Sequence, residues 1–347
     1  MTDTVAQSPF LPGTKVQFAW DSTSLGYLKT CPRLYQYHMI DGWAERGSSA
    51  IHLRFGIELH SALQQYDIER AEGRDHDDAV RHVVYDTLKR IKDPADPFDP
   101  DRTERAGNYK NPDTLIALIV DYLDKFQDDA AKTYILQDGR PAVELSFRFE
   151  LDWGPSAYQK LKPGEFSLKP GAINYIDGAE EPSGQPYLLC GHLDRVVDFN
   201  DGLYVMDHKT TMTTPGPYYF SQFGPNNQMT LYTIASGIVL DSPVKGVIID
   251  ALQILLESPN NFQRGFTYRT PALLNEWLKD LSYWLRQAET FAEANYWPMN
   301  DTACDKFGGC RFREICAKDP SAREAFLKGK FDKLAPEDRW NPLKPRT

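Results

Sequence analysis

The sequence predicts an α/β fold in which a mixed β-sheet is flanked by helices. Residues 51–71 carry apolar side chains at helical spacing, whereas residues 187–199 and 203–209 are rich in strand formers. An apolar helix is expected over 228–240 and a further strand over 244–256. With 347 residues, of which 41% are hydrophobic and 25% charged, the chain is long enough to bury a sizeable core.

The remaining elements follow from the same periodicities and from proline and glycine punctuation. We expect helices over 22–40, 78–91, 114–132 and 271–295, strands over 142–151 and 262–269, a loop over 93–113, and an insertion over 154–185. Residues 1–20 are expected to be irregular. Glu144 and Asp198 are either additional acidic groups near a site or ordinary strand-surface residues, and the second interpretation is favoured.

A turn signal between the two central strands predicts a tight hairpin. With a two-residue loop at 201–202, Asp194 lies opposite Lys209. Alternation then places Asp194, Asp207 and Lys209 on one face of the sheet. The two carboxylates become diagonal neighbours, roughly 7 to 8 Å apart at the backbone, which is close enough to share one hard cation. A surface hairpin with an Asp194–Lys209 ion pair fits the same pattern, and such a pair contributes little stability.

His60 is a further candidate ligand, on the expected helix over 51–71. It falls on one line with Leu53, Ile57 and Gln64, so we expect it to face inward within an apolar stripe. A lone histidine of this kind is more often a hydrogen-bonded core residue. Because the acidic pair needs another ligand, metal binding is the favoured interpretation.

Gln228 and Tyr232 lie one turn apart on the same side of the helix that follows the hairpin. By themselves they fit equally well as polar residues on a helix surface. Their position after the other motifs makes them candidate site residues.

As a set, these motifs resemble the RecB-like branch of the PD-(D/E)xK nuclease superfamily. The motifs occur in the order His60, Gly191-His192-Leu193-Asp194-Arg195, Asp207-His208-Lys209 and Gln228-xxx-Tyr232. The resemblance spans residues 22–316 and implies a restriction-endonuclease-like core.

The resemblance also implies a role for each of these residues. The ligands of Mg²⁺ or Mn²⁺ would be His60, Asp194, Asp207 and the backbone carbonyl of His208. Lys209 would act at the attacking water, and Gln228 and Tyr232 would position the nucleic-acid strand or the lysine.

Four of the five cysteines form a second pattern, with one near the start of the chain and three near its end. They are Cys31, Cys304, Cys310 and Cys316. This arrangement resembles the iron–sulfur staple of AddB-like and CRISPR-associated exonucleases, which implies a 4Fe-4S cluster bound by four thiolates. The late cysteines are spaced C-x5-C-x5-C, whereas many members have C-x2-C-x5-C.

A four-cysteine zinc site is an open alternative for these thiols, and so are four unrelated reduced cysteines. Disulfides are not expected, because the number of cysteines is odd and no secretory signal is recognised. We expect one elaborated nuclease domain over 1–347. Its core would cover about 50–270, and a helical iron–sulfur lobe would be formed by both chain ends, about 22–45 plus 297–330.

Composition limits the possible partners. The formal charge of −10 argues against a broadly basic DNA-coating surface. No apolar run approaches a membrane helix, so we expect a cytoplasmic protein without a membrane partner. No phosphate-binding Walker loop is present, and any helicase or recombination partner would be another polypeptide.

The expected function is that of a metal-dependent DNA nuclease. The resemblance favours an exonuclease on single-stranded DNA or duplex ends, in recombination, repair, CRISPR adaptation or phage DNA metabolism. The first alternative is a noncatalytic nucleic-acid-binding or assembly subunit of a helicase–nuclease complex, with an iron–sulfur or zinc staple. A zinc-stapled scaffold without a nucleic-acid role is the second.

Overall fold

The computed structural model describes eight stretches of the chain. They are residues 7–46, 51–92, 109–155, 168–169, 172–173, 186–256, 260–305 and 309–344. Most of the expected loop over 93–113 and of the expected insertion over 154–185 therefore lies outside the described residues.

The chain divides into two compact units. The first, called here the terminal unit, contains Met1–Ser48, Ser146–Gly191 and Pro271–Thr347. The second, called the central unit, contains Ser49–Leu145 and His192–Thr270. The expected single domain, with a core and an iron–sulfur lobe, stays a prediction.

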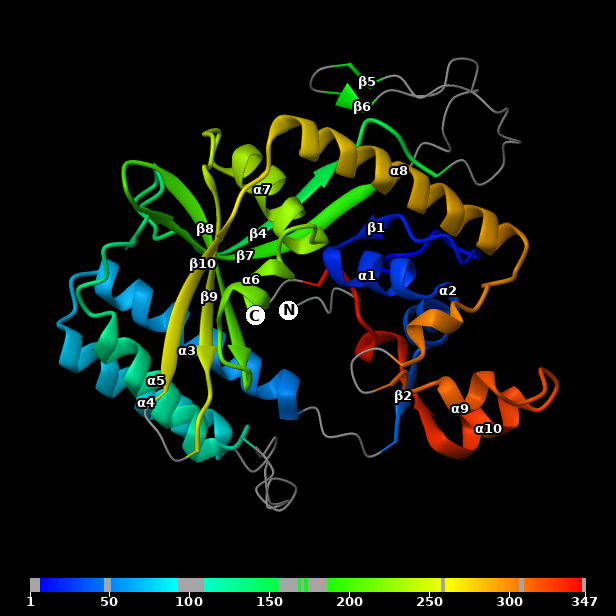
Figure 1. The fold of residues 1–347 in the computed structure, drawn as a ribbon, viewed down its shortest axis with the longest axis horizontal. Helices are drawn as coiled ribbons and strands as arrows, with labels where there is room; N and C mark the ends of the chain where they lie inside the picture. Colours follow the sequence, from blue (N-terminus) through cyan, green and yellow to red (C-terminus); the bar gives the residue numbers. More distant parts are fainter. Residues whose placement is uncertain are drawn as a thin grey trace. The chain divides into compact units, whose positions relative to one another are not determined.

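The central unit is built on a mixed sheet, as expected (Figure 1). Strand β8 (Leu203–Thr211) pairs antiparallel with β7 (Leu188–Asp198) and parallel with β9 (Gly246–Gln253). Strand β10 (Asn261–Thr267) pairs antiparallel with β9. Two further strands, β3 (Lys132–Thr133) and β4 (Val143–Glu150), pair with β7. The parallel β8–β9 pair is joined through helices α6 (Pro217–Ser221) and α7 (Asn227–Val239), as a parallel connection requires.

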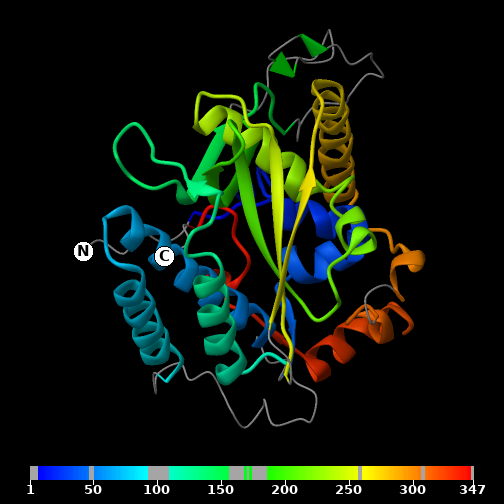
Figure 2. The same ribbon diagram turned by 60° about the vertical axis from the view of Figure 1, so that its left-hand side comes forward.

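Helices α3 (Ile51–Ala71), α4 (His76–Ile91) and α5 (Pro112–Lys125) lie together on one side of this sheet (Figure 2). They bury a common core that includes Leu59, Leu118 and Leu252. Helix α5 begins at Pro112 because Asn111 and Thr114 form a capping box, and it ends at Lys125 rather than at the expected residue 132. Among the described helices, none is both long and apolar enough to cross a bilayer.

The inward stripe expected on α3 is wrong. Leu53 and Ile57 are 58% and 51% exposed, whereas Phe55 and Leu59 are buried. The buried face is therefore rotated away from the predicted line, and His60 lies at its border with intermediate exposure. The helix itself has the predicted bounds.

In the terminal unit, the expected helix over 22–40 is interrupted at Cys31. Helix α1 (Ser22–Thr30) ends there, and helix α2 (Pro32–Tyr35) runs into a π-helical turn, Gln36–Ile40. Cys31 has an extended backbone, with φ −164° and ψ 115°. The following proline explains the break, because its ring disfavours helical geometry in the residue before it.

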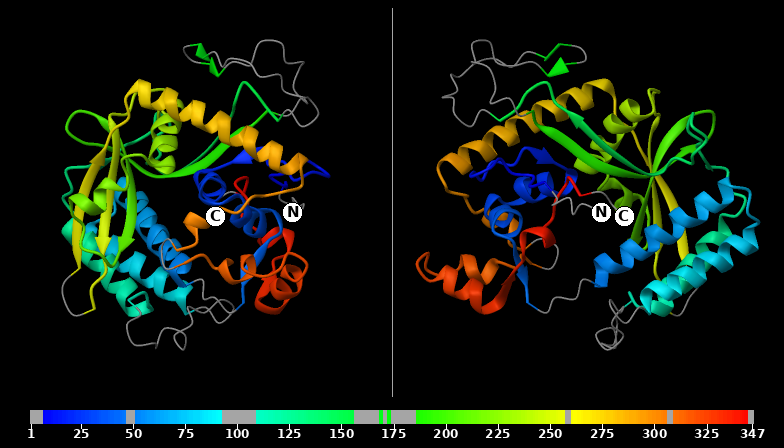
Figure 3. Two further views of the ribbon diagram at one scale, coloured as in Figure 1. Left: turned by 45° about the vertical axis from the view of Figure 1, so that its right-hand side comes forward. Right: turned by 180° about the vertical axis from the view of Figure 1, so that it is seen from behind.

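One strand from the first fifty residues pairs with one from the last twenty within the terminal unit (Figure 3). Strand β2 (Trp43–Glu45) pairs antiparallel with β11 (Phe331–Lys333). The other elements are β1 (Ala19–Trp20), the β5–β6 pair (Leu168–Lys169, Ala172–Ile173), α8 (Pro271–Glu293), α9 (Arg313–Cys316), α10 (Arg323–Lys330) and 3-10 turns at Asp301–Ala303 and Pro336–Asp338. Trp340 Nε1 donates a hydrogen bond to Asp21 Oδ2 at 2.8 Å, which ties the last segment to the start of α1.

Two glycines of the central unit give opposite predictions for substitution by alanine. A Cβ at Gly265 of β10 would approach the Phe220 ring to 2.2 Å, whereas a Cβ at Gly237 of α7 would meet nothing within 4 Å. Gly265→Ala should lower stability by about 1 to 3 kcal/mol through overpacking. Gly237→Ala should raise it by about 0.5 to 1 kcal/mol through helix propensity. Thermal melts of the two variants would check this, and equal shifts would contradict the packing of Phe220.

Candidate metal centre

The hairpin of β7 and β8 has a longer turn than the sequence suggested. Asp198 pairs with Leu203, so four residues connect the strands, and Asn200 and Asp201 adopt left-handed backbones with φ 48° and 57°. The predicted register is therefore wrong by two residues. Because the shift is even, it leaves every side chain on its predicted face. If the ladder continued, Asp194 would lie opposite Asp207 rather than opposite Lys209.

The ladder does not continue, because β7 and β8 stop pairing after Arg195 and Met206. Strand β8 remains paired with β9 as far as Thr211. The backbone N–H of His208 donates to Asp194 Oδ2 at 3.2 Å. The Asp194 carboxylate thus accepts the hydrogen bond that a backbone carbonyl of a paired strand would otherwise accept.

Three possible ligands converge where the strands part. His60 Nδ1 lies 3.4 Å from Asp194 Oδ2 and 3.6 Å from Glu144 Oε1. One ligand atom from each residue lies within 4.8 Å of the other two. Burial alone would lower the pKa of His60, but the negative charges of Asp194 and Glu144 outweigh it and raise that pKa. The triad therefore attracts positive charge.

Glu144 is the residue that pattern analysis missed. It belongs to β4, but its backbone has φ 45°, in the left-handed region that non-glycine residues rarely adopt. Alternation along a strand assumes an extended backbone, so it does not describe where this side chain points. Strained backbones of this kind concentrate at functional sites. An unusual φ has no sequence signature, so the pattern of β4 favoured a surface position for Glu144.

Asp207 and Lys209 form a partly buried ion pair close to the triad. Lys209 Nζ lies 2.8 Å from Asp207 Oδ2, and Asp207 is completely buried. Burial raises the pKa of Asp207; Lys209 opposes this effect and the nearby charge of Asp194 adds to it, so that the pKa lies at about 6. The carboxylate is held in a place where its negative charge is poorly compensated.

A hydrogen-bonded chain connects Lys209 to α7. Lys209 Nζ donates to Gln228 Oε1 at 2.9 Å, and Gln228 Nε2 donates to Tyr232 OH at 2.9 Å. The structure therefore links the two helix residues to the lysine. Whether they act in chemistry stays a prediction.

The side chain of His208 lies on the opposite face of β8. Its Nε2 is 3.2 Å from Tyr122 OH, and Tyr122 donates to Asp250 Oδ2 at 2.6 Å. Burial holds the pKa of His208 well below its usual range, so the ring is neutral. Only the backbone of His208 faces the centre, and the predicted role of its carbonyl stays a prediction.

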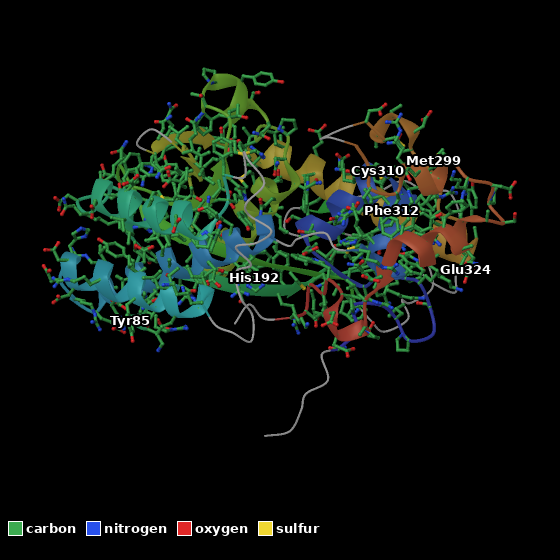
Figure 4. The ribbon with its side chains drawn as sticks, turned by 90° about the horizontal axis from the view of Figure 1, so that it is seen from below. Tyr85, His192, Met299, Cys310, Phe312 and Glu324 are labelled. Carbon is green, nitrogen blue, oxygen red and sulfur yellow. The ribbon has the colours of Figure 1, made fainter. Side chains whose placement is uncertain are left out.

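The four cysteines of the second pattern line one small cavity in the terminal unit. These are Cys31, Cys304, Cys310 and Cys316, together with Leu34, Met299, Asn300, Ala303 and Phe312. Figure 4 shows Met299, Cys310 and Phe312 close together. Cys31 Sγ accepts a hydrogen bond from the Asn300 N–H at 3.3 Å. All five cysteines have free thiols, and Cys190 is a buried residue that does not line this cavity.

Replacing Asp207 by asparagine should stabilise the metal-free protein at pH 7. The carboxyl has a higher pKa in the folded state than in the unfolded chain, so the folded state binds the proton more tightly. Its contribution to stability is therefore lost as pH rises from about 4 through about 6. Asp207→Asn should recover roughly 1 to 3 kcal/mol at pH 7.

Thermal melts in EDTA at pH 7 and pH 5 would check this, with Asp198→Asn as the control. Asp198 lies on the same strand pair and is exposed. A melting temperature of Asp207→Asn below that of the parent protein at pH 7 would show that the Lys209 pair outweighs burial.

Similarity to known proteins identifies a family for this chain. A protein family described as the PD-(D/E)XK nuclease superfamily matches residues 22–317. No curated protein matches the chain. The crystal structure of SSO0001 is similar at 9% sequence identity, with a TM-score of 0.29, and the match covers 77% of this chain and 76% of that chain.

Proposed function

Because the chain belongs to the PD-(D/E)XK nuclease superfamily, we propose that it is a divalent-metal-dependent deoxyribonuclease that hydrolyses phosphodiester bonds. Its substrate would be single-stranded DNA or the ends of a duplex, digested as an exonuclease. The observation that carries the proposal is the convergence of His60, Glu144 and Asp194 beside the partly buried Asp207–Lys209 pair.

The donor set fits Mg²⁺ or Mn²⁺. Carboxylate oxygens suit both ions, and an imidazole nitrogen is compatible with Mn²⁺. His60, Asp194 and Asp207 would be ligands, as the sequence predicts. Glu144 would be a further ligand because it lies beside His60 and Asp194. When bound, the cation would polarise the phosphoryl oxygen and lower the pKa of a water. It would also offset the negative charge of the buried Asp207 more fully than Lys209 does alone.

Lys209 would act on the attacking water and on the developing negative charge of the phosphoryl group. Its ammonium has three N–H donors, and Asp207 and Gln228 take two of them. The third is left to orient a water or to contact a phosphoryl oxygen. Gln228, itself hydrogen-bonded to Tyr232, fixes the direction in which the ammonium points. This preorganisation places a positive charge where the transition state needs it.

We also propose a 4Fe-4S cluster on Cys31, Cys304, Cys310 and Cys316. Support comes from their position around one cavity and from the N–H of Asn300 that points at Cys31 Sγ, since such bonds tune iron–sulfur centres. Zinc is the alternative occupant. It would hold neighbouring sulfurs about 3.8 Å apart, given Zn–S bonds near 2.3 Å.

Lys209→Ala should lower DNA cleavage at least 100-fold, because it removes the charge that orients the nucleophile. The assay uses end-labelled linear single-stranded and duplex DNA, with a closed circle, in Mg²⁺ or Mn²⁺. Cleavage of the linear substrates alone would establish an exonuclease, and the label would report its direction. Lys89→Ala on α4 is the charge-matched control and should cleave normally. Wild-type protein that holds its metals and cleaves none of the substrates would refute the proposal.

Cys31→Ser should remove the broad visible absorbance of an iron–sulfur cluster and lower thermal stability, because one ligand of a site that joins both chain ends is lost. Cys190→Ser is the matched control and should retain the absorbance, since Cys190 does not line the cavity. Protein that is colourless as purified without oxygen and contains one equivalent of zinc would identify the alternative occupant.

A further inference from the structure

Helix α6 lies over the same face of the sheet as the catalytic carboxylate. Asp207 of β8 pairs with Ile249 of β9, and Ile249 pairs with Gly265 of β10. Paired residues in a row project to the same face. Two strand spacings separate the ends of this row, which is about 10 Å. The ring of Phe220, from α6, occupies the space that a side chain at Gly265 would fill.

The segment that carries α6 is anchored to the sheet. Phe223 is buried, and its carbonyl accepts hydrogen bonds from Thr267 Oγ1 at 3.0 Å and from Arg269 Nη2 at 2.9 Å. Together with Phe220, these contacts anchor the C-terminal end of α6 and the residues that follow it. The short helix is therefore held against the sheet from that end.

Two adjacent tyrosines of α6 differ in how deeply they are buried. Tyr219 is half-buried, with its ring 5.3 Å from that of Phe220 and 5.7 Å from that of Phe223. Burial, with a smaller contribution from the charge of Asp207, raises the pKa of Tyr219 to about 12. Tyr218, the adjacent residue, is 91% exposed. An aromatic side chain so exposed on an anchored turn contributes little to folding.

We propose that Tyr218 and Tyr219 form a platform on which the bases of a single-stranded nucleic acid stack while its backbone enters the metal centre. Tyrosine rings stack on any base, so such a platform needs no sequence preference. The chain has a formal charge of −10, which limits the affinity available from neutralising phosphates. Stacking supplies affinity without added positive charge. Bases inside a duplex already stack on one another, so the ligand is a single strand or a frayed end.

This inference deepens the proposed nuclease function and rests on it, so binding is measured apart from cleavage. The probe is a fluorescein-labelled single-stranded oligonucleotide, and its anisotropy is followed in Mg²⁺ with the Lys209→Ala protein. Adding Tyr218→Ala should weaken binding about five- to 100-fold, whereas Tyr218→Trp should preserve it. The control is Tyr85→Ala on α4. Tyr85 is 60% exposed and lies apart from His192 of β7 in Figure 4.

A second oligonucleotide series places one abasic site at successive positions. If Tyr218 stacks on a base, one abasic position weakens binding to the parent protein but has little further effect on Tyr218→Ala. Additive effects at every position, or equal losses for Tyr218→Ala and Tyr85→Ala, would overturn the platform.

The two proposals can fail separately. In one outcome, Tyr218 is coupled to an abasic position but the protein that retains Lys209 does not cleave DNA. That outcome would support the platform and refute the nuclease. Normal cleavage without such coupling would leave the nuclease and refute the platform. Unchanged melting temperature of Tyr218→Ala would show that the binding loss is not a loss of folding, whereas an unfolded variant would refute the placement of Tyr218 on the surface.

Discussion

The bond from the His208 N–H to the Asp194 carboxylate organises the centre of this protein. A backbone donor within a sheet needs a partner, and here the partner is a side chain because β7 has already turned away from β8. The bond holds Asp194 beside the strand that carries Asp207 and Lys209. Beside this bond, where β7 and β8 are no longer paired, His60 of α3 lies near both Asp194 and Glu144 of β4. One strand position whose N–H pairs with a side chain therefore lies where three elements meet.

Charge is distributed unequally between the two faces of β8. On the face of His208, Asp250 is balanced by Tyr122 and by Arg264, which also pairs with Asp129. On the other face, Asp194, Asp207 and Glu144 share Lys209 and His60 as nearby positive or protonatable partners. The first set pairs the Asp250 carboxylate with a hydroxyl and a guanidinium and fixes the strand. In the second set, three carboxylates face these two partners among the described residues, and such an excess of negative charge favours the binding of a cation.

Much of the architecture followed from periodicity, because α3, the central hairpin, β9 and α8 have strong patterns. The sequence predicted the face of the sheet on which a residue lies better than the residues that it contacts. Asp194, Asp207 and Lys209 were assigned to one face through a register that was wrong by two residues, since parity alone decides the face. Leu53 and Ile57 were misplaced because periodicity cannot tell which apolar line meets the core. Glu144 was missed because its role depends on a backbone angle, and Cys31 was placed inside a helix although Pro32 follows it.

The poorly compensated Asp207 has a consequence for the lifetime of the protein. A ligand that binds only the folded state shifts the folding equilibrium toward that state. Degradation by proteases depends on how often a protein opens. If the centre binds a divalent cation as proposed, molecules without the cation would keep the cost of burying Asp207 and would open more often, so they would be degraded first. The same carboxylate would then keep the surviving population enriched in molecules whose centre is loaded.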